Sequence, residues 1–215
     1  YAVVQVEYHD QVACLSTPKA PHACDLEVTG GGGVYRVVGR QPPLPIKGAG
    51  PAVAVATSGD DVAYVPATST SVPDGEPLAS ASVPVEIRDV HSGSLVASVA
   101  PEGTPLAVGL SNSVLALLTR TPAGLVLSWY AKSSGKIVHA VSVAPTTSAE
   151  LAVGTSAIVY RVGRAIRAVD LRTGKIRALA KAAATPIGLS IAGDRVAWAE
   201  NIAGRGRIRA VTIAP

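Results

Sequence analysis

Arg164-Ala-Ile-Arg-Ala-Val-Asp-Leu-Arg-Thr-Gly-Lys-Ile-Arg-Ala-Leu-Ala180 is the stretch that decides the fold of this chain. On both sides of Arg172-Thr-Gly-Lys175, apolar residues alternate with polar or small ones, as expected for a half-buried β-strand. The glycine between them suits a tight turn, because glycine adopts positive φ without steric cost. The stretch therefore predicts two antiparallel strands joined by a short hairpin.

The same order of strands and turns returns along the chain. The hairpin glycines Gly93, Gly135 and Gly174 each follow a strand-like run and precede another. Repeats of four short strands in about 40 residues are typical of β-propeller blades. We predict an all-β protein, a β-propeller of about five four-stranded blades. A β-sandwich is the alternative, since it also has evenly spaced short strands.

The composition supports the all-β prediction. The 215 residues include 21 Gly and 16 Pro, which leave no room for a long helix, and neither Phe nor Met is present. Val, Ile, Leu and Ala must therefore fill the core, which suits stacked sheets. We treat residues 1–215 as a single domain. Residues 66–82 are rich in Ser, Thr and Pro and are expected to form a flexible insertion within a blade.

Two kinds of hairpin resemble motifs of known bacterial propellers. Val169-Asp-Leu-Arg-Thr-Gly-Lys-Ile176 and Arg88-Asp-Val-His-Ser-Gly-Ser-Leu95 resemble the hairpin between the last two strands of quinoprotein-like and YVTN-type blades. Gly193-Asp-Arg-Val-Ala-Trp198 and Gly59-Asp-Asp-Val-Ala-Tyr64 resemble the hairpin of TolB-type propellers. The resemblance covers the chain from about residue 50 onward and implies blades. The Trp that quinoproteins carry after the hairpin is missing, so no bound quinone or other cofactor is expected.

The last repeat reaches Pro215 after only three strands. In the interpretation we favour, Tyr1–Tyr8 supplies the fourth strand and closes the ring. In the other, a second chain completes the blade, and the protein is a subunit of an assembly.

The only cysteines, Cys14 and Cys24, lie in two short strand-like runs. Two thiols without further metal ligands at suitable spacing indicate a disulfide, and hence an extracytoplasmic location. Reduced thiols in a cytosolic protein are the alternative. The first residue is Tyr1 rather than Met, so either a leader has been removed or the chain is part of a longer protein.

Positive charge gathers near the carboxyl end. Residues 1–160 hold 8 Lys and Arg against 12 Asp and Glu, whereas residues 161–215 hold 11 against 3. Such asymmetry can mark a surface for an anionic partner, although arginines that alternate with apolar residues also fit an ordinary solvated strand face. The candidate basic face comprises Arg161, Arg164, Arg167, Arg172, Arg177, Arg205, Arg207 and Arg209.

No catalytic or metal-binding motif is found. His9, Asp10, His22 and Asp25 form a weak cluster of possible metal ligands, but nothing constrains their geometry. Asp60 and Asp61 are explained by turn preference, and no Gly-x-Ser-x-Gly elbow occurs. We predict neither catalytic residues nor a metal site, and a non-enzymatic protein is favoured over an enzyme.

These observations together favour an extracytoplasmic interaction or scaffold propeller, secreted or on the surface of a bacterial cell. Its partner would be a protein, a second copy of the chain or an acidic glycan. A carbohydrate-binding or carbohydrate-cleaving propeller is the alternative. Nucleic acid is disfavoured as a partner, because base stacking needs aromatic residues and Tyr160 is the only one near Arg161, Arg164, Arg167, Arg172 and Arg177. No apolar run is long enough to span a bilayer.

Overall fold

The computed structural model describes residues 2–5, 10–17, 20–28, 33–38, 40–66, 84–144 and 150–213, with the backbone alone up to residue 28. All regular structure in these residues is β-strand, which confirms the all-β prediction. None of the described residues forms a helix that could cross a membrane. Residues 67–83, and with them most of the expected insertion, lie outside the described residues.

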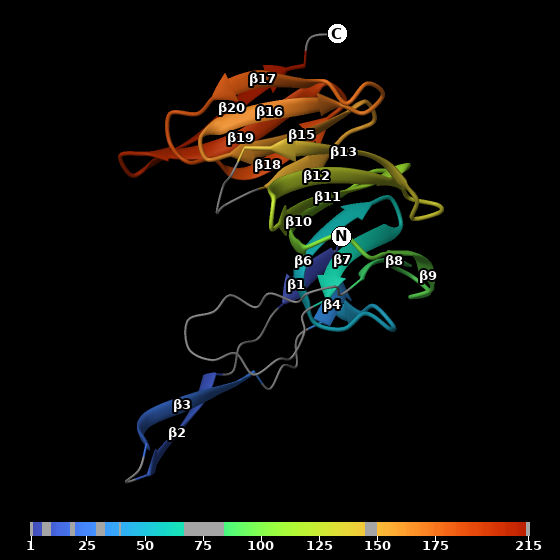
Figure 1. Cartoon of the computed structure of the whole chain (residues 1–215). Helices are drawn as coiled ribbons and strands as arrows, with labels where there is room; N and C mark the ends of the chain where they lie inside the picture. The colour runs from blue at the N-terminus through green and yellow to red at the C-terminus, as the bar shows by residue number, and fades with distance from the viewer. Residues whose placement is uncertain are drawn as a thin grey trace.

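Four antiparallel sheets are arranged like the blades of a four-bladed β-propeller (Figure 1). The first blade contains β6 (Ala52–Ser58), β7 (Asp61–Pro66), β8 (Val85–Asp89) and β9 (Leu95–Val99). The second contains β10 (Thr104–Leu110), β11 (Val114–Thr121), β12 (Gly124–Ala131) and β13 (Ile137–Val143). The third contains β14 (Leu151–Val153), β15 (Ala157–Val162), β16 (Ala165–Asp170) and β17 (Ile176–Lys181). The last contains β18 (Ile187–Ala192), β19 (Arg195–Ile202) and β20 (Arg205–Thr212).

The amino-terminal part does not form a further four-stranded blade. A three-stranded sheet, which we call the first-end sheet, contains β1 (Ala2–Gln5), β4 (Gly33–Arg36) and β5 (Leu44–Pro45). A separate hairpin contains β2 (Asp10–Thr17) and β3 (Ala20–Val28). The described residues therefore form four blades rather than the predicted five or so, because the described strands before residue 51 are divided between these two smaller units.

The blades are built by the repeat seen in the sequence. In each of the three hairpins with a central glycine, the glycine N–H donates to the carbonyl four residues earlier, over 2.9 Å at Gly93, 2.8 Å at Gly135 and 2.9 Å at Gly174. All three glycines have positive φ, between 63° and 73°. The hairpin prediction is confirmed.

A second repeated hydrogen bond holds the two turns at one rim of each blade together. In each blade, a backbone N–H after the third strand donates to the carbonyl of a residue in the turn before the second strand, over 2.7 to 2.9 Å. The pairs are Val90 with Asp60, Lys132 with Ser113, Leu171 with Ser156 and, at the end of β20, Ile213 with Asp194. Because the bond recurs in all four blades, it gives a common reference for comparing equivalent positions.

Successive blades pack face to face, as the contacts between β6, β10, β14 and β18 also show. We call the face that lies against the following blade the forward face, and the opposite one the backward face. The forward faces contain Ala63, Val65, Val85 and Ile87 in the first blade, Ala116, Leu118, Leu127 and Trp129 in the second, and Ala157, Val159, Ile166 and Ala168 in the third. These sheets stack in series rather than as one facing pair, so the arrangement is not a β-sandwich.

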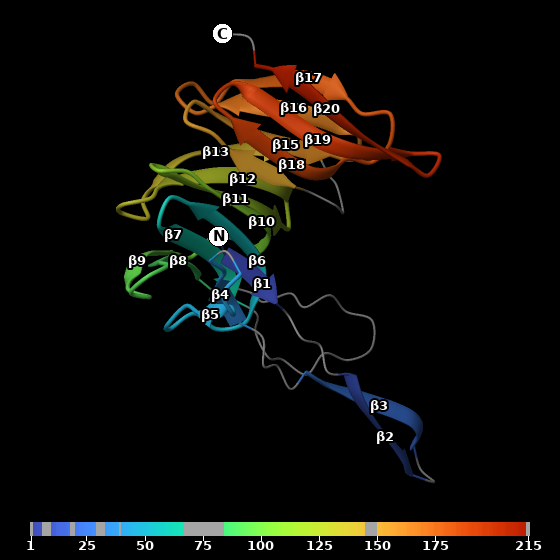
Figure 2. The same ribbon diagram turned by 180° about the vertical axis from the view of Figure 1, so that it is seen from behind.

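The row of sheets has two distinct ends. The last blade packs on β14 and β15, and both views place it at the opposite end from β1 and β4 (Figures 1 and 2). Strand β1 pairs with β4, not with β20. The expected closure of the ring by Tyr1–Tyr8 is therefore wrong, since the first strand is already used in the first-end sheet.

The packing of Gly93 generates a stability prediction. A Cβ atom there would lie 2.3 Å from the carbonyl oxygen of Lys47, which belongs to the backbone and cannot rotate away. Gly163 has a similar φ of +57°, but no heavy atom lies within 4 Å of the equivalent position. Alanine at either site costs about 1 kcal/mol for its left-handed backbone. At Gly93, overpacking adds roughly 1–3 kcal/mol.

We therefore expect Gly93→Ala to lower the free energy of unfolding clearly more than the control Gly163→Ala, as measured by urea denaturation. Equal losses in the two variants would contradict the close contact between Gly93 and Lys47.

Candidate functional site

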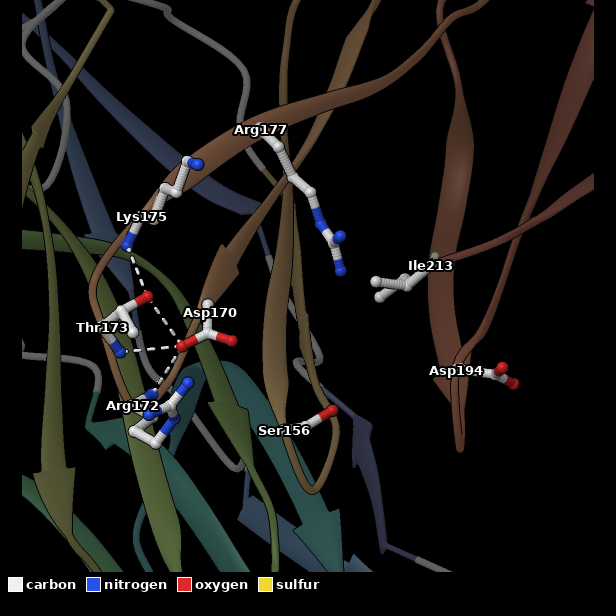
Figure 3. Close-up of a pocket in the computed structure, with 8 residues that line it drawn as sticks. All are labelled: Ser156, Asp170, Arg172, Thr173, Lys175, Arg177, Asp194 and Ile213. Atoms are coloured by element: carbon white, nitrogen blue, oxygen red, sulfur yellow. Dashed lines mark hydrogen bonds between the residues drawn. The ribbon is translucent and has the colours of Figure 1, made fainter. Parts of the chain in front are cut away.

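A pocket of about 770 Å³, lined mainly by polar and charged residues, opens between the third and last blades (Figure 3). We call it the rim pocket, because it lies at the turns joined by the repeated hydrogen bond. Its lining residues come from the turn before β15, the β16–β17 hairpin and the ends of the last blade: Ser156, Asp170, Arg172, Thr173, Lys175, Arg177, Asp194 and Ile213.

The carboxylate of Asp170 is committed to its own hairpin. Its Oδ1 accepts from the backbone N–H of Arg172 at 3.0 Å, the N–H of Thr173 at 2.7 Å and the hydroxyl of Thr173 at 2.8 Å. The hydrogen bonds from Thr173 hold the pKa of Asp170 below its ordinary value of 3.8. A carboxylate that stays ionised and is held by three donors to one oxygen is a structural group, not a proton carrier.

The same device is found in the first blade, where Oδ1 of Asp89 accepts from the N–H groups of His91 and Ser92 and from the hydroxyl of Ser92. Hydrogen bonds from Ser92 likewise keep the pKa of Asp89 below 3.8. The second blade has Ala131 at this place and keeps only the backbone part of the turn. The carboxylate is thus a turn element that two of the blades share.

Cationic side chains dominate the rest of the rim pocket. Arg172 and Lys175 are exposed on the hairpin, and Arg177 follows on β17. In Figure 3 the guanidinium of Arg177 points across the space between the blades toward Ile213. Arg172 and Lys175 are thus the exposed cations of the pocket, whereas Arg177 is half-buried and already has a partner within the chain. The two carboxylates of the pocket are Asp170, which is held by the hairpin, and Asp194, which lies on the opposite wall.

Other members of the predicted basic face lie elsewhere in the third blade. Arg161 is buried, with 5% of its surface exposed, and forms an ion pair with Glu150 at 3.1 Å. Arg164 is exposed, and its Nε donates to the carbonyl of Ala182 at 2.8 Å, at the end of the blade away from the rim pocket. Arg167 is half-buried on β16. None of these three lines the rim pocket.

Arg205, Arg207 and Arg209 are exposed on β20. They begin at the end of β20 that pairs with Ile202, whereas Asp194 and Ile213 of the rim pocket lie at the other end of the same hairpin. The structure thus divides the predicted basic face into a cluster at the rim pocket and a second group on β20. Sequence reasoning included Arg172 and Arg177 but missed Lys175, although it lies in the same turn.

A second pocket of about 440 Å³ lies between the first two blades and is also polar in part. Its lining includes Glu102, Tyr130 and the hairpin glycine Gly135. Burial raises the pKa of Tyr130, so its hydroxyl stays protonated at neutral pH. No cationic side chain lines this pocket, so the two pockets differ in charge.

The described residues contain no arrangement suited to nucleophilic catalysis. His91 interacts with Asp60 through Nε2 at 3.2 Å and with Arg36 through Nδ1, so both ring nitrogens are occupied. Tyr64, Glu86 and Arg88 form a second polar cluster, in which Glu86 Oε2 accepts from Tyr64 at 2.5 Å and from Arg88 at 2.8 Å. Neither cluster places a serine or cysteine beside a free base.

No group of three His, Cys, Asp or Glu side chains in the described residues could hold a metal ion. His9 lies outside the described residues, and the side chains of His22 and Asp25 do too. The weak metal cluster considered from the sequence therefore stays untested. For the cysteines, the backbone register pairs Cys14 with Cys24 directly across β2 and β3. The disulfide remains a prediction, which this register supports.

Most aromatic side chains serve the interfaces between sheets. Tyr64, Trp129, Tyr130, Tyr160 and Trp198 are all buried, with at most 7% of their surface exposed. Trp198 additionally donates its indole N–H to the buried carboxylate of Glu200 at 2.7 Å. None of these rings lies on a surface where it could stack on a sugar or a base.

No protein-family model and no curated protein sequence matches the chain. Solved structures do match it. The computationally designed Ika4 protein is 16% identical over 77% of this chain and 92% of its own, with a TM-score of 0.53. Kuenenia stuttgartiensis hydrazine synthase is 11% identical over 75% of this chain and 46% of its own, with a TM-score of 0.52. BamB from Moraxella catarrhalis is 14% identical over 84% of this chain and 52% of its own, with a TM-score of 0.50.

The chain thus spans about half the length of the natural proteins that it matches here. At such low identity these likenesses show the fold alone. They agree with a β-propeller arrangement and do not distinguish quinoprotein-like, YVTN-type or TolB-type blades.

The role of Asp170 predicts a pH-dependent loss of stability. Because its pKa is lowered by folding, its contribution is complete above the ordinary value of 3.8 and is lost as the pH falls through the lower folded value. We expect Asp170→Asn to be less stable than the unmodified chain at pH 7, and the difference to shrink as the pH falls below 3.8. Urea denaturation across this range measures it. The equivalent variant Asp89→Asn should behave in the same way, and a difference independent of pH would contradict the structural role of the carboxylate.

Proposed function

We propose that this chain is a non-enzymatic, extracytoplasmic interaction or scaffold propeller and a subunit of a multi-chain assembly. Its rim pocket binds an acidic segment of a partner protein. The observation that carries the proposal is the charge of this pocket: Arg172, Lys175 and Arg177 line it, whereas the carboxylate of Asp170 is held by three donors from its own hairpin. Such a surface attracts and orients anionic groups.

An acidic protein segment fits the pocket better than a sugar or a nucleic acid. Sugar and base recognition commonly uses exposed aromatic rings, but the described rings from Tyr64 to Trp198 are buried between sheets. The pocket supplies cations and hydroxyl groups instead, from Ser156 and Thr173. Carboxylates are the matching partners for this set, and arginine binds them in bidentate fashion.

An extracytoplasmic location is supported by the cysteines. The register places Cys14 opposite Cys24 in a two-stranded hairpin that pairs only with itself. Isolated two-stranded hairpins are marginally stable in water, so a cross-strand disulfide would supply the stability that strand pairing alone does not give. Such bonds persist in oxidising compartments.

Binding to an acidic peptide tests the function. We expect labelled poly-glutamate to bind the chain by fluorescence anisotropy and to dissociate when salt is raised to about 0.5 M, because surface ion pairs are screened. The double variant Arg172→Glu with Lys175→Glu should weaken binding by at least about tenfold, or about 1.4 kcal/mol. The control Arg120→Glu with Lys136→Glu makes the same change of charge on the second blade, where both residues are exposed.

Equal weakening by both double variants would show a non-specific effect of net charge and contradict a site at the rim pocket. Binding of heparin but not of poly-glutamate would favour the carbohydrate alternative. Binding of neither would refute an anionic partner.

The redox state of the cysteines tests the compartment. We expect alkylation of the unfolded, unreduced chain to leave both thiols unmodified, and prior reduction to add two alkyl groups to the intact mass. The physical reason is the direct opposition of Cys14 and Cys24 in the register. Two alkyl groups without reduction, in protein exported to the bacterial periplasm, would remove the support for an extracytoplasmic location.

A further inference from the structure

Among the described residues, none packs on the forward face of the last blade. In each blade, one turn carbonyl accepts the repeated hydrogen bond. The residue three positions after it is Ala63 in the first blade, Ala116 in the second and Val159 in the third, and all three are 0% exposed. The equivalent residue of the last blade, Ala197, is only half-buried.

The third strands show the contrast more clearly. The residue five positions before the donor of this hydrogen bond is Val85 in the first blade, Leu127 in the second and Ile166 in the third. All three are 0% exposed. Their equivalent in the last blade is Ile208, which is 83% exposed. The chain thus builds the same apolar face four times and covers it three times.

The two faces of the last blade differ in charge, and the outward face holds Ser190, Asn201 and Thr212 beside its apolar residues. Val211 packs toward the third blade, so strand alternation places Arg205, Arg207 and Arg209 on that same backward side. Ile208 and Ala210 therefore point away from the body. Their register partners Ala199 and Ala197 on β19 share this face, as does Ile187 of β18, which is 59% exposed. Among the described side chains, Arg195 is the one charged group on it.

At the opposite end of the row, no sheet of the described residues packs on the outer side of the first-end sheet. In the first-end sheet, Val34 is buried against Ala52, Val62 and Tyr64 of the first blade. Alternation therefore directs Tyr35, with its register partner Pro45, to the other side. Tyr35 is half-buried and Pro45 exposed, and both figures place this sheet at the far end from β18–β20 (Figures 1 and 2).

We infer that the last blade docks on the first-end sheet of a second copy of this chain, head to tail. The inference rests on the proposed role as an assembly subunit and names the partner. Within one chain, the forward face of each of the first three blades packs on the backward face of the next blade. A surface that could pack on the last blade in the same way is therefore a backward face with no sheet on it. Each copy carries one, at its first-end sheet.

The docking contact would be made mainly by apolar side chains, so we expect it to persist at high salt, unlike ionic binding at the rim pocket. Light scattering during size-exclusion chromatography of chain 1–215 is expected to show twice the monomer mass of 21.7 kDa as concentration rises, and the dimer should persist at about 0.5 M salt. Ile208→Arg should raise the dissociation constant by about a hundredfold or more, because it buries an unpaired charge. The control Ile137→Arg makes the same change at a residue that is 60% exposed and outside the docking face, and should have no effect.

A monomer at every concentration would overturn the inference, and so would a dimer that Ile208→Arg does not weaken. A series of larger masses that Ile208→Arg abolishes would still support head-to-tail docking, in an open chain instead of a closed pair. Poly-glutamate binding by the Ile208→Arg monomer tests the rim pocket separately, so the failure of one proposal is distinguishable from the failure of the other.

Cross-linking tests the arrangement. Ala210→Cys in one copy and Pro45→Cys in another should be joined by a short bis-maleimide when the two variants are mixed, and Ile208→Arg in the Ala210→Cys chain should abolish the product. Both chains carry Cys14→Ser and Cys24→Ser to remove other thiols. Products only between two Ala210→Cys chains would show that two last blades face each other, which would overturn the head-to-tail arrangement.

Discussion

Burial of both faces of each blade is the constraint on which this structure depends. A three- or four-stranded sheet of Val, Leu, Ile and Ala has two apolar faces and cannot cover either alone. In β7, β11 and β15 the central residues are buried without interruption, because a neighbouring sheet lies on each side. In β19 buried residues alternate with more exposed ones, because it has one neighbour. The same sequence pattern thus has different consequences at different places in the row.

The turns convert this repeated packing into a chemically distinct rim. Hairpin glycines lie close to the preceding sheet, and the carboxylates of Asp89 and Asp170 satisfy the backbone donors of their turns. Each carboxylate stays ionised and accepts these donors through one oxygen, while neighbouring side chains of the hairpin are exposed. In the third blade, where Arg172 and Lys175 lie in the hairpin, this gives a positive surface.

The two ends of the row give the molecule its direction. The blade interfaces are also strengthened by polar contacts, such as the ion pair at 2.6 Å between Lys132 and Asp61 of successive blades. Such contacts join successive blades, whereas no sheet of the described residues packs on the outer faces of the first-end sheet and the last blade. The last blade thus carries a largely apolar outer face, and the rim pocket with its exposed Arg172 and Lys175 lies on its other side, against the third blade.

The sequence alone determined the strand order from about residue 50 onward, the hairpins around Gly93, Gly135 and Gly174, and the all-β class. These features follow from local chemistry, namely the φ preference of glycine and the alternation of side chains along a strand. It could not give the number of blades, because the pairing of β1 with β4 joins residues separated by a long segment. Nor could it show that Arg161 is buried with Glu150 while Arg172 lines a pocket, since both look alike in an alternating pattern. Only the tertiary structure decided which apolar faces are covered, because that depends on which sheet lies next to which.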